Sequence, residues 1–154
     1  MPENIILPNL LNMKLSMRTR YGLRALIDLA REKERPVSIR EIAGREHISL
    51  RYLENIFNDL VREGLLVSMR GKNGGFRLAR PLERITLLDV VEVLEGKVRI
   101  VECLEPESTC HATGCLARGV WLNLNNRITE ALACVTLKEV FEGENEFPGQ
   151  MDRM

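Results

Sequence analysis

Apolar residues in the first part of the chain recur with a helical period. In residues 17–33 they lie three and four positions apart, and arginines occupy the other faces. Pro36 follows, and the element ends before it because proline cannot continue a helix. The apolar positions are Leu23, Leu26, Ile27 and Ala30. This pattern predicts an amphipathic first helix.

The same period returns in two segments that follow at once. The first begins with a capping box, in which the side chains of Ser38 and Glu41 each accept from the other's backbone amide. The second begins after Ser49, a suitable N-cap, and ends at Gly64, which suits the left-handed position after a helix. The apolar positions are Ile39, Ile42 and Ala43, then Leu53, Ile56, Phe57, Leu60 and Val61. A short helix, a turn and a longer helix predict a helix-turn-helix.

The period then changes to that of β-strands. Residues 65–70 and 76–80 can pair as a hairpin, because the glycines between them allow positive φ. These glycines are Gly71, Gly74 and Gly75. The basic side chains of the hairpin are Arg70, Lys72, Arg77 and Arg80. A helix-turn-helix followed directly by a basic, glycine-tipped hairpin is typical of a winged helix.

Two more helical patterns follow the hairpin. Thr86 and Asp89 repeat the capping arrangement and open a helix that stops at Gly96. Residues 116–136 carry an apolar stripe at four-residue spacing, made by Leu116, Val120, Leu124, Ile128 and Leu132. A long helix that is apolar on one side needs a surface to cover it, and either its own domain or a second subunit can supply one. Bacterial-type operators are read by symmetric dimers, which favours the second subunit. We therefore expect a homodimer.

The fold class expected from these patterns is mainly α with a small β-hairpin wing. It consists of a winged helix-turn-helix domain plus a long C-terminal dimerisation helix. The predicted division is an N-terminal tail at 1–12, a DNA-binding domain at 13–82, a connecting helix and cysteine loop at 83–115, the dimerisation helix at 116–136, and a C-terminal helix with an acidic tail at 137–154.

Charge supports a nucleic-acid partner, although the formal net charge is zero. Residues 13–80 contain 15 Lys and Arg against 8 Asp and Glu, whereas residues 81–154 contain 7 against 13. A basic first half joined to an acidic second half predicts a polyanion-binding module followed by a different one.

Other function classes find little support in the chain. No apolar run approaches the ~20 residues that span a bilayer, and residues 1–12 lack the basic start and cleavage site of a signal peptide. We therefore expect a cytoplasmic protein with no membrane partner. The sequence offers no nucleophile–base set, phosphate loop or paired catalytic carboxylates, so we expect no enzyme.

The second helix of the helix-turn-helix is expected to enter the major groove of double-stranded DNA. Its candidate contact residues are Ser49, Arg51, Tyr52, Glu54 and Asn55. Arg51 can bind guanine or simply a phosphate. Glu54 can accept from a cytosine amino group or penalise other sequences.

The wing and the first helix supply the other candidate DNA contacts. Arg70, Lys72 and Arg77 are expected to reach the minor groove or flanking phosphates. Arg20 and Arg24 of the first helix are candidates for gripping the DNA backbone, with a solvated helix face as the alternative.

Three of the four cysteines, Cys103, Cys110 and Cys115, lie in the stretch "CLEPESTCHATGC". In a reducing compartment such clustering favours a metal or redox role over a structural disulfide. Zinc usually takes four Cys or His ligands, and the spacings of known zinc knuckles are not matched. Thiolates favour iron–sulfur chemistry. Cys134 lies near the apolar face of the long helix, where we expect it to be buried by packing.

Three stretches resemble a known family: "MKLSMRTRYGLRALIDLA", "ISLRYLENIFNDLVREGLLVSMRGKNGGFRLAR" and "ITLLDVVEVLEG". They are similar to the winged-helix regulators typified by IscR, an iron–sulfur cluster regulator, and NsrR, a nitric-oxide sensor. The resemblance covers roughly residues 13–140 and implies that the three loop cysteines bind an iron–sulfur cluster, 2Fe–2S rather than 4Fe–4S.

The chain departs from this family in two ways. Its loop cysteines are separated by six and then four residues, whereas the family spaces them evenly. The positions that supply a fourth ligand in the family hold Arg118 and Arg20 here. The remaining candidates for the fourth ligand are His111, Glu102, Glu105 and Glu107, besides water or a small thiol.

The function expected from residues and resemblance together is transcriptional regulation controlled by an iron–sulfur cluster. The signal can be iron supply, oxygen, nitric oxide or redox potential, and the sequence does not choose. Two alternatives stay open: a cluster-free regulator that acts by binding a metabolic enzyme, and a zinc-stabilised dimer.

Overall fold

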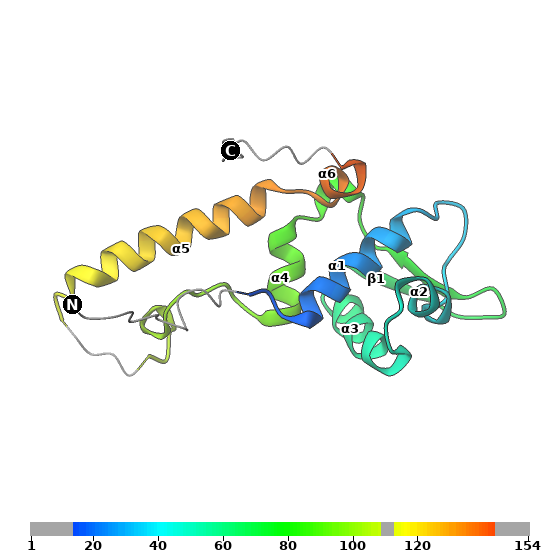
Figure 1. The fold of residues 1–154 in the computed structure, drawn as a ribbon, viewed down its shortest axis with the longest axis horizontal. Coiled ribbons are helices and arrows are strands. Elements are labelled where there is room, and N and C mark those ends of the chain that lie inside the picture. Colours follow the sequence, from blue (N-terminus) through cyan, green and yellow to red (C-terminus); the bar gives the residue numbers. More distant parts are fainter. Residues whose placement is uncertain (1–13, 109–112, 144–154) are drawn as a thin grey trace, which may run out of the picture.

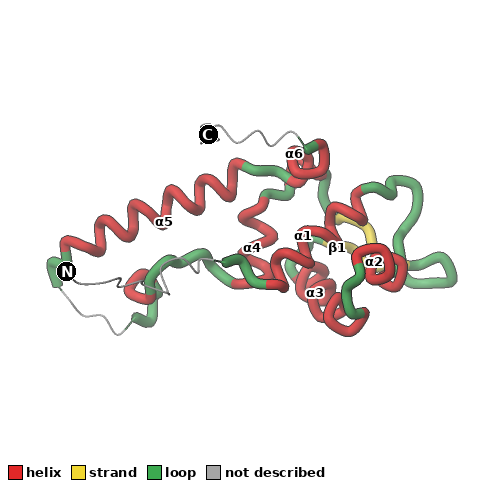
Figure 2. The backbone as a smooth tube through the Cα atoms, viewed as in Figure 1, coloured by secondary structure: helices red, strands yellow, loops and turns green. Residues whose placement is uncertain are grey.

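The computed structural model describes residues 14–108 and 113–143, and it has the mainly helical fold with one hairpin that the patterns predict (Figures 1 and 2). The helices are α1 (Met17–Ala30), α2 (Ile39–Glu46), α3 (Leu50–Arg62), α4 (Leu87–Glu95), α5 (Leu116–Cys134) and α6 (Leu137–Glu142). The strands are β1 (Leu66–Met69) and β2 (Gly75–Leu78), and short 3-10 turns lie at η1 (Leu82–Arg84) and η2 (Glu102–Leu104).

Local signals place the ends of the helix-turn-helix. The capping box at the start of α2 is confirmed, because the Ser38 N–H donates to Glu41 Oε2 at 2.9 Å and the Glu41 N–H donates to Ser38 Oγ at 3.3 Å. Ser49 stands at the N-cap of α3, as predicted, but its side chain makes no capping hydrogen bond. Gly64 ends α3 with φ of 74°, as predicted.

The wing is wider than a simple hairpin. β1 and β2 pair antiparallel, and Val37 lies along the other edge of β2. The N–H of Val37 donates to the carbonyl of Phe76 at 3.0 Å, and the reverse bond is 2.8 Å. Gly75 permits this approach, since a Cβ at that position would lie 2.5 Å from the Val37 carbonyl oxygen. The wing is therefore fastened to the segment between α1 and α2.

The core lies between α1, α3, α4 and the base of the wing. Phe57, with 1% of its surface exposed, meets Phe76 edge-to-face with ring centroids 4.9 Å apart. Asp28 is also buried, and its carboxylate accepts from the Arg45 guanidinium at 2.7 Å, which offsets the cost of burying the charge. The apolar positions predicted for the first three helices are buried or pack against this core.

The chain returns to this core after the long helix. Val135 accepts from the N–H of Leu87, and Ile85 accepts from the N–H of Leu137, both at 2.8 Å. Leu137 itself is fully buried among the residues of the winged helix. The short helix α6 that it begins has its own capping box, between Thr136 and Glu139. The patterns used above did not assign Leu137 to the core.

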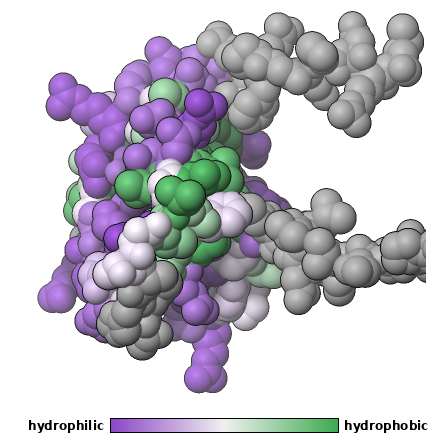
Figure 3. Space-filling model, turned by 90° about the vertical axis from the view of Figure 1, so that its left-hand side faces the viewer, coloured by the Kyte–Doolittle hydropathy of each residue, from purple (hydrophilic) through white to green (hydrophobic). Residues whose placement is uncertain are grey.

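Helix α5 extends away from the winged helix and contacts α4 and η2 (Figure 1). The structure describes all 19 of its residues, and none of them is buried. Seen from the side to which α5 extends, apolar side chains gather at the centre of the face (Figure 3). The large exposed apolar residues of α5 are Leu116, Val120, Trp121, Leu122 and Leu124. None of the described helices has the length and hydropathy that crossing a membrane requires.

One prediction about this helix was wrong. Cys134 was expected to be buried by packing, but its side chain is exposed at the end of α5. The helix meets α4 and η2 and leaves its remaining surface open, so an apolar position on α5 is not a buried position within one chain.

Candidate functional site

Helix α3 presents a polar face to solvent on the side opposite its buried residues. Arg51, Glu54 and Asn55 are exposed, as is Ser49 just before the helix. The side chains of Leu53, Ile56, Phe57 and Leu60 hold the other side of α3 in the core. The structure therefore brings together the residues that the sequence predicted for base contact.

Tyr52 differs from its predicted neighbours because it is partly buried. Its ring meets that of Tyr21 on α1 edge-to-face, with centroids 5.9 Å apart. The guanidinium of Arg24 lies 5.5 Å from the Tyr21 ring centre, and it also donates to the Glu46 carboxylate at 2.9 Å and carbonyl at 2.7 Å. Arg24, considered above as a phosphate contact, is thus engaged within the protein and helps to join α1, α2 and α3.

The cations of the wing fall into two groups. Arg70 and Lys72 are exposed at the tip, and neither has an ion-pair partner among the described residues. Arg77 instead donates to the Glu34 carbonyl at 2.6 Å, and Arg80 donates to the Gly64 carbonyl at 3.3 Å. The tip is therefore free to meet a polyanion, whereas Arg77 and Arg80 fasten the wing to neighbouring loops.

Two further arginines are exposed, one on α1 and one on α2. Arg20, predicted from the sequence, lies in the second turn of α1, and its guanidinium contacts the sulfur of Met17. Arg40, which the sequence reasoning missed, is exposed in the first turn of α2 and has no ion-pair partner among the described residues. The sequence could have predicted a DNA-backbone contact for Arg40, because the first helix of a helix-turn-helix crosses the DNA backbone.

The cysteine stretch is described at its two ends. Cys103 lies in η2 and is partly exposed, and Cys115 is exposed at the N-cap of α5. Cys110 and the ligand candidate His111 lie outside the described residues. The other candidates, Glu102, Glu105 and Glu107, are exposed. Within residues 14–108 and 113–143, no three Cys, His, Asp or Glu side chains are grouped so that they could hold a metal ion.

The segment leading into Cys103 is held at two points. The Arg99 guanidinium donates to the Leu104 carbonyl at 2.7 Å and closes the η2 turn. The N–H of Ile100 donates to Oδ1 of Asn125, in the middle of α5, at 3.0 Å. The segment that leads into Cys103, which we call the Cys103 limb of the loop, therefore lies along α5.

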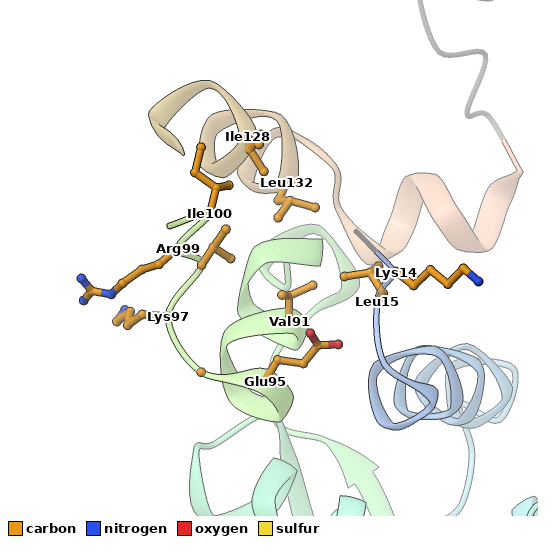
Figure 4. A pocket seen from close by; sticks show the side chains of 11 residues that line it. Lys14, Leu15, Val91, Glu95, Lys97, Arg99, Ile100, Ile128 and Leu132 are labelled. Atoms are coloured by element: carbon orange, nitrogen blue, oxygen red, sulfur yellow. The ribbon is translucent and has the colours of Figure 1, made fainter. Parts of the chain in front are cut away.

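A cavity of about 420 Å³ lies where α5 passes the winged helix (Figure 4). Apolar side chains of α4 and α5 line it, among them Val91, Ile128 and Leu132. Glu95 lies at its edge, where the carboxylate accepts from the N–H of Ser16 at 2.8 Å and so joins the end of α4 to the start of α1. The cavity shows that α5 packs incompletely on its own domain.

Comparison with known proteins identifies related chains. Residues 15–143 match the model of the Rrf2 family, described as an iron-dependent transcriptional regulator. Protein rrf2 of Nitratidesulfovibrio vulgaris is 38% identical over 138 residues, which cover 88% of this chain and 92% of that protein. The transcriptional regulator IscR of Xenorhabdus nematophila is 34% identical over 133 residues, which cover 86% of this chain and 81% of that protein.

Solved structures give the same result. CymR, the global cysteine regulator of B. subtilis, superposes with a TM-score of 0.70 at 34% identity, covering 85% of this chain and 98% of that one. IscR of T. potens superposes with a TM-score of 0.68 at 32% identity, covering 93% of this chain and 95% of that one. The winged-helix fold and the resemblance seen in the sequence are both confirmed.

Proposed function

The chain belongs to the Rrf2 family of transcriptional regulators, and we propose that it binds operator DNA as a homodimer whose affinity is set by an iron–sulfur cluster. The relatives named above are regulators of transcription, which agrees with the expectation that the chain is not an enzyme. One observation carries the proposal. A cysteine segment connects a complete winged helix to a long helix whose apolar face is uncovered.

The homodimer rests on the exposure of α5. Leu116 is 92% exposed and Val120 is 63% exposed, values that a stable monomer rarely leaves on a contiguous face. A second copy of the same helix offers an apolar face of the same kind, as a two-fold interface requires. Dimerisation would also pair two recognition helices, so that a palindromic operator is read at two half-sites.

For DNA reading we assign base contacts to α3 and phosphate contacts to its surroundings. The exposed Arg51, Glu54 and Asn55 would face the major groove, with Ser49 and Tyr52 at the start of the helix. Arg70 and Lys72 at the tip of the wing would bind the minor groove or phosphates. Arg20 and Arg40 would bind phosphates, while Arg77 would act mainly by positioning the wing.

The donor chemistry of the loop fits an iron–sulfur cluster. Cys103, Cys110 and Cys115 would supply three thiolates, which such clusters prefer, and one iron would accept a non-cysteine ligand. When bound, the cluster supplies a redox- and iron-dependent centre. We propose that the cluster is of the 2Fe–2S type. We also propose that the protein is cytoplasmic and that its target is a double-stranded DNA operator.

The chain's own contacts would couple this loop to DNA binding. Cys115 caps α5, and Cys103 lies in the segment that Ile100 fastens to the middle of the same helix. A change in the loop would therefore act on α5. Displacing the two α5 helices would change the spacing of the paired recognition helices and so the operator affinity.

The test is anaerobic purification, followed by a visible spectrum and assays for iron, sulfide and zinc. Cys103→Ala, Cys110→Ala and Cys115→Ala are each expected to lose cluster absorbance. Cys134→Ala, at the far end of α5, is the matched control and should keep it. A colourless, iron-free wild type that binds its operator normally would exclude the cluster, and one equivalent of zinc per chain would favour the zinc-stabilised dimer.

CymR is described as the global cysteine regulator of B. subtilis, and the similarity to it supports one alternative, in which this chain regulates without a cluster. The chain would then respond to a protein or thiol signal through the same α5 interface. Operator affinity that is independent of iron, but changes on adding a metabolic enzyme partner, would favour this alternative.

A further inference from the structure

The middle of α5 is built from residues that form helices poorly. Asn123, Asn125 and Asn126 stand together in the "LNLNN" stretch, and asparagine is a weaker helix former than alanine or leucine in a helix interior. An asparagine side chain also competes for backbone hydrogen bonds. A helix that projects from its domain gains little packing energy to offset this, so the stretch requires another explanation.

The three asparagines do not occupy equivalent positions. Asn125 accepts the Ile100 N–H through its side-chain oxygen at 3.0 Å, and this bond is part-buried. Its backbone carbonyl also accepts from the Thr129 hydroxyl at 2.9 Å, which adds a local bond on the same turn. Asn123 lies on a different part of the helix surface, in a hollow with Val120 and Leu124. Only one of these asparagines is therefore seen to hold the cysteine segment, within the described residues.

We propose that Asn125 is a positioning residue that holds the Cys103 limb of the loop beside α5, an inference that rests on the proposed function. Cys115 and Asn125 are ten residues apart, which is about 15 Å along a helix. Ile100 precedes Cys103 by three residues, which span at most about 10 Å. The Ile100–Asn125 bond therefore keeps Cys103 close to α5, whose N-cap residue is Cys115.

Without this bond the limb would be held less well. The preceding residues 96–99 leave the end of α4, where Lys97 pairs with Glu92 at 2.7 Å. The segment would then be held to α5 only by the packing of η2 on that helix. Cys103 would lie less firmly beside α5, although the cysteine itself is unaltered. Asn125 thus acts on the ligands through the backbone of Ile100 and does not itself bind the cluster.

The experiment compares Asn125→Leu and Asn125→Asp with the control Asn123→Leu. Leucine removes the acceptor but favours helix, whereas aspartate keeps an acceptor oxygen. In the cluster-free protein we measure exchange of the Ile100 amide by NMR and the alkylation rate of Cys103 in a Cys110→Ser, Cys115→Ser, Cys134→Ser background. In the loaded protein we measure the rate of cluster loss to a chelator.

Loss of one part-buried hydrogen bond is expected to change these rates about two- to tenfold. Asn125→Leu should speed amide exchange, Cys103 alkylation and cluster loss, while Asn125→Asp and Asn123→Leu remain close to wild type. The helix content of each variant is checked by circular dichroism. If the helix content of Asn125→Leu is lower than that of wild type, Asn125→Ala replaces it. Equal rates in Asn125→Leu and wild type, or equal changes in Asn123→Leu, would overturn the proposal.

The two cluster-free measurements separate this inference from the proposed function. If the wild type holds no iron, the function as proposed fails, whereas the Ile100 and Cys103 rates still report whether Asn125 positions the limb. If iron is present but Asn125→Leu behaves as wild type, the function stands and the positioning role of Asn125 fails.

Discussion

The winged helix and the long helix α5 use apolar residues in opposite ways. In the winged helix, Leu26 and Phe57 have 0% and 1% of their surfaces exposed. In α5, Leu116 and Val120 have 92% and 63% exposed. The first region completes its own core, and the second leaves its apolar face for another surface. The same hydrophobic periodicity thus predicts folding in one region and association in the other.

The largest expected difference concerns core truncation. Phe57→Ala should lower the free energy of unfolding by about 3–5 kcal/mol, because it removes a buried aromatic ring that packs on Phe76. Leu124→Ala, at a position 43% exposed in the single chain, should cost much less at low protein concentration. Urea denaturation at two protein concentrations measures both.

This comparison also tests the dimer. The effect of Leu124→Ala should grow with protein concentration if α5 is buried in a homodimer, since association stabilises the folded state by mass action. An effect that is equally small at every concentration, with wild type sedimenting as a monomer, would contradict the interface assigned to α5.

The next effect compares two glycines, one in each region. Gly75→Ala should destabilise by about 1–3 kcal/mol, because the residue has φ of 156° and its Cβ would meet the Val37 carbonyl. Gly119→Ala in α5 meets no atom within 4 Å and should stabilise the helix by up to about 1 kcal/mol. Thermal unfolding of both variants gives opposite signs, and a stable Gly75→Ala would disprove the close approach of Val37 to the wing.

A smaller effect concerns the two capped helices that begin side by side. Thr86 caps α4 and Thr136 caps α6, and the two threonines pair in an antiparallel bridge. Thr86→Ala and Thr136→Ala should each cost about 1 kcal/mol. If α6 belongs to the winged-helix core, both variants should unfold in one transition with a lowered midpoint. If α6 frays independently of the core, the Thr136→Ala variant would instead unfold at the wild-type midpoint.

The smallest effect depends on pH. Hydrogen bonds from Arg35 and then from the backbone and side chain of Ser38 lower the pKa of Glu41 to about 2, from its ordinary 4.5. A lowered folded-state pKa gives stability that is present above pH 4.5 and is lost as the pH falls towards 2. The melting temperature of Glu41→Gln should lie below that of wild type near neutral pH, and the two should converge on acidification. A gap that is constant with pH would contradict this.

Much of the fold could be predicted because its signals are local. The Ser38–Glu41 and Thr86–Asp89 boxes, and Gly64 after α3, set helix ends through neighbouring atoms. The role of Leu137 was missed, although Thr136 and Glu139 carry the same capping signature, because burial against Ile85 depends on a contact far away in the sequence.

The candidate site was less predictable for the same reason. Arginine has the same charge whether it faces solvent or a carbonyl. The sequence therefore could not distinguish Arg70, which is exposed at the tip of the wing, from Arg77, which donates to the Glu34 carbonyl. Cys134 has a helical position that suggested burial, but exposure depends on whether a second surface is present. The acceptor role of Asn125 had no sequence signal beyond its poor fit to a helix interior.

The return of Leu137 to the core makes the cysteine segment and α5 an insertion in the winged-helix unit. Residues of one compact unit lie on both sides of it, at α4 before the cysteine segment and at α6 after the long helix. Both ends of this insertion are anchored in one core, at Leu87 and Leu137. The spacing of its cysteines can therefore change without a change in the winged helix itself.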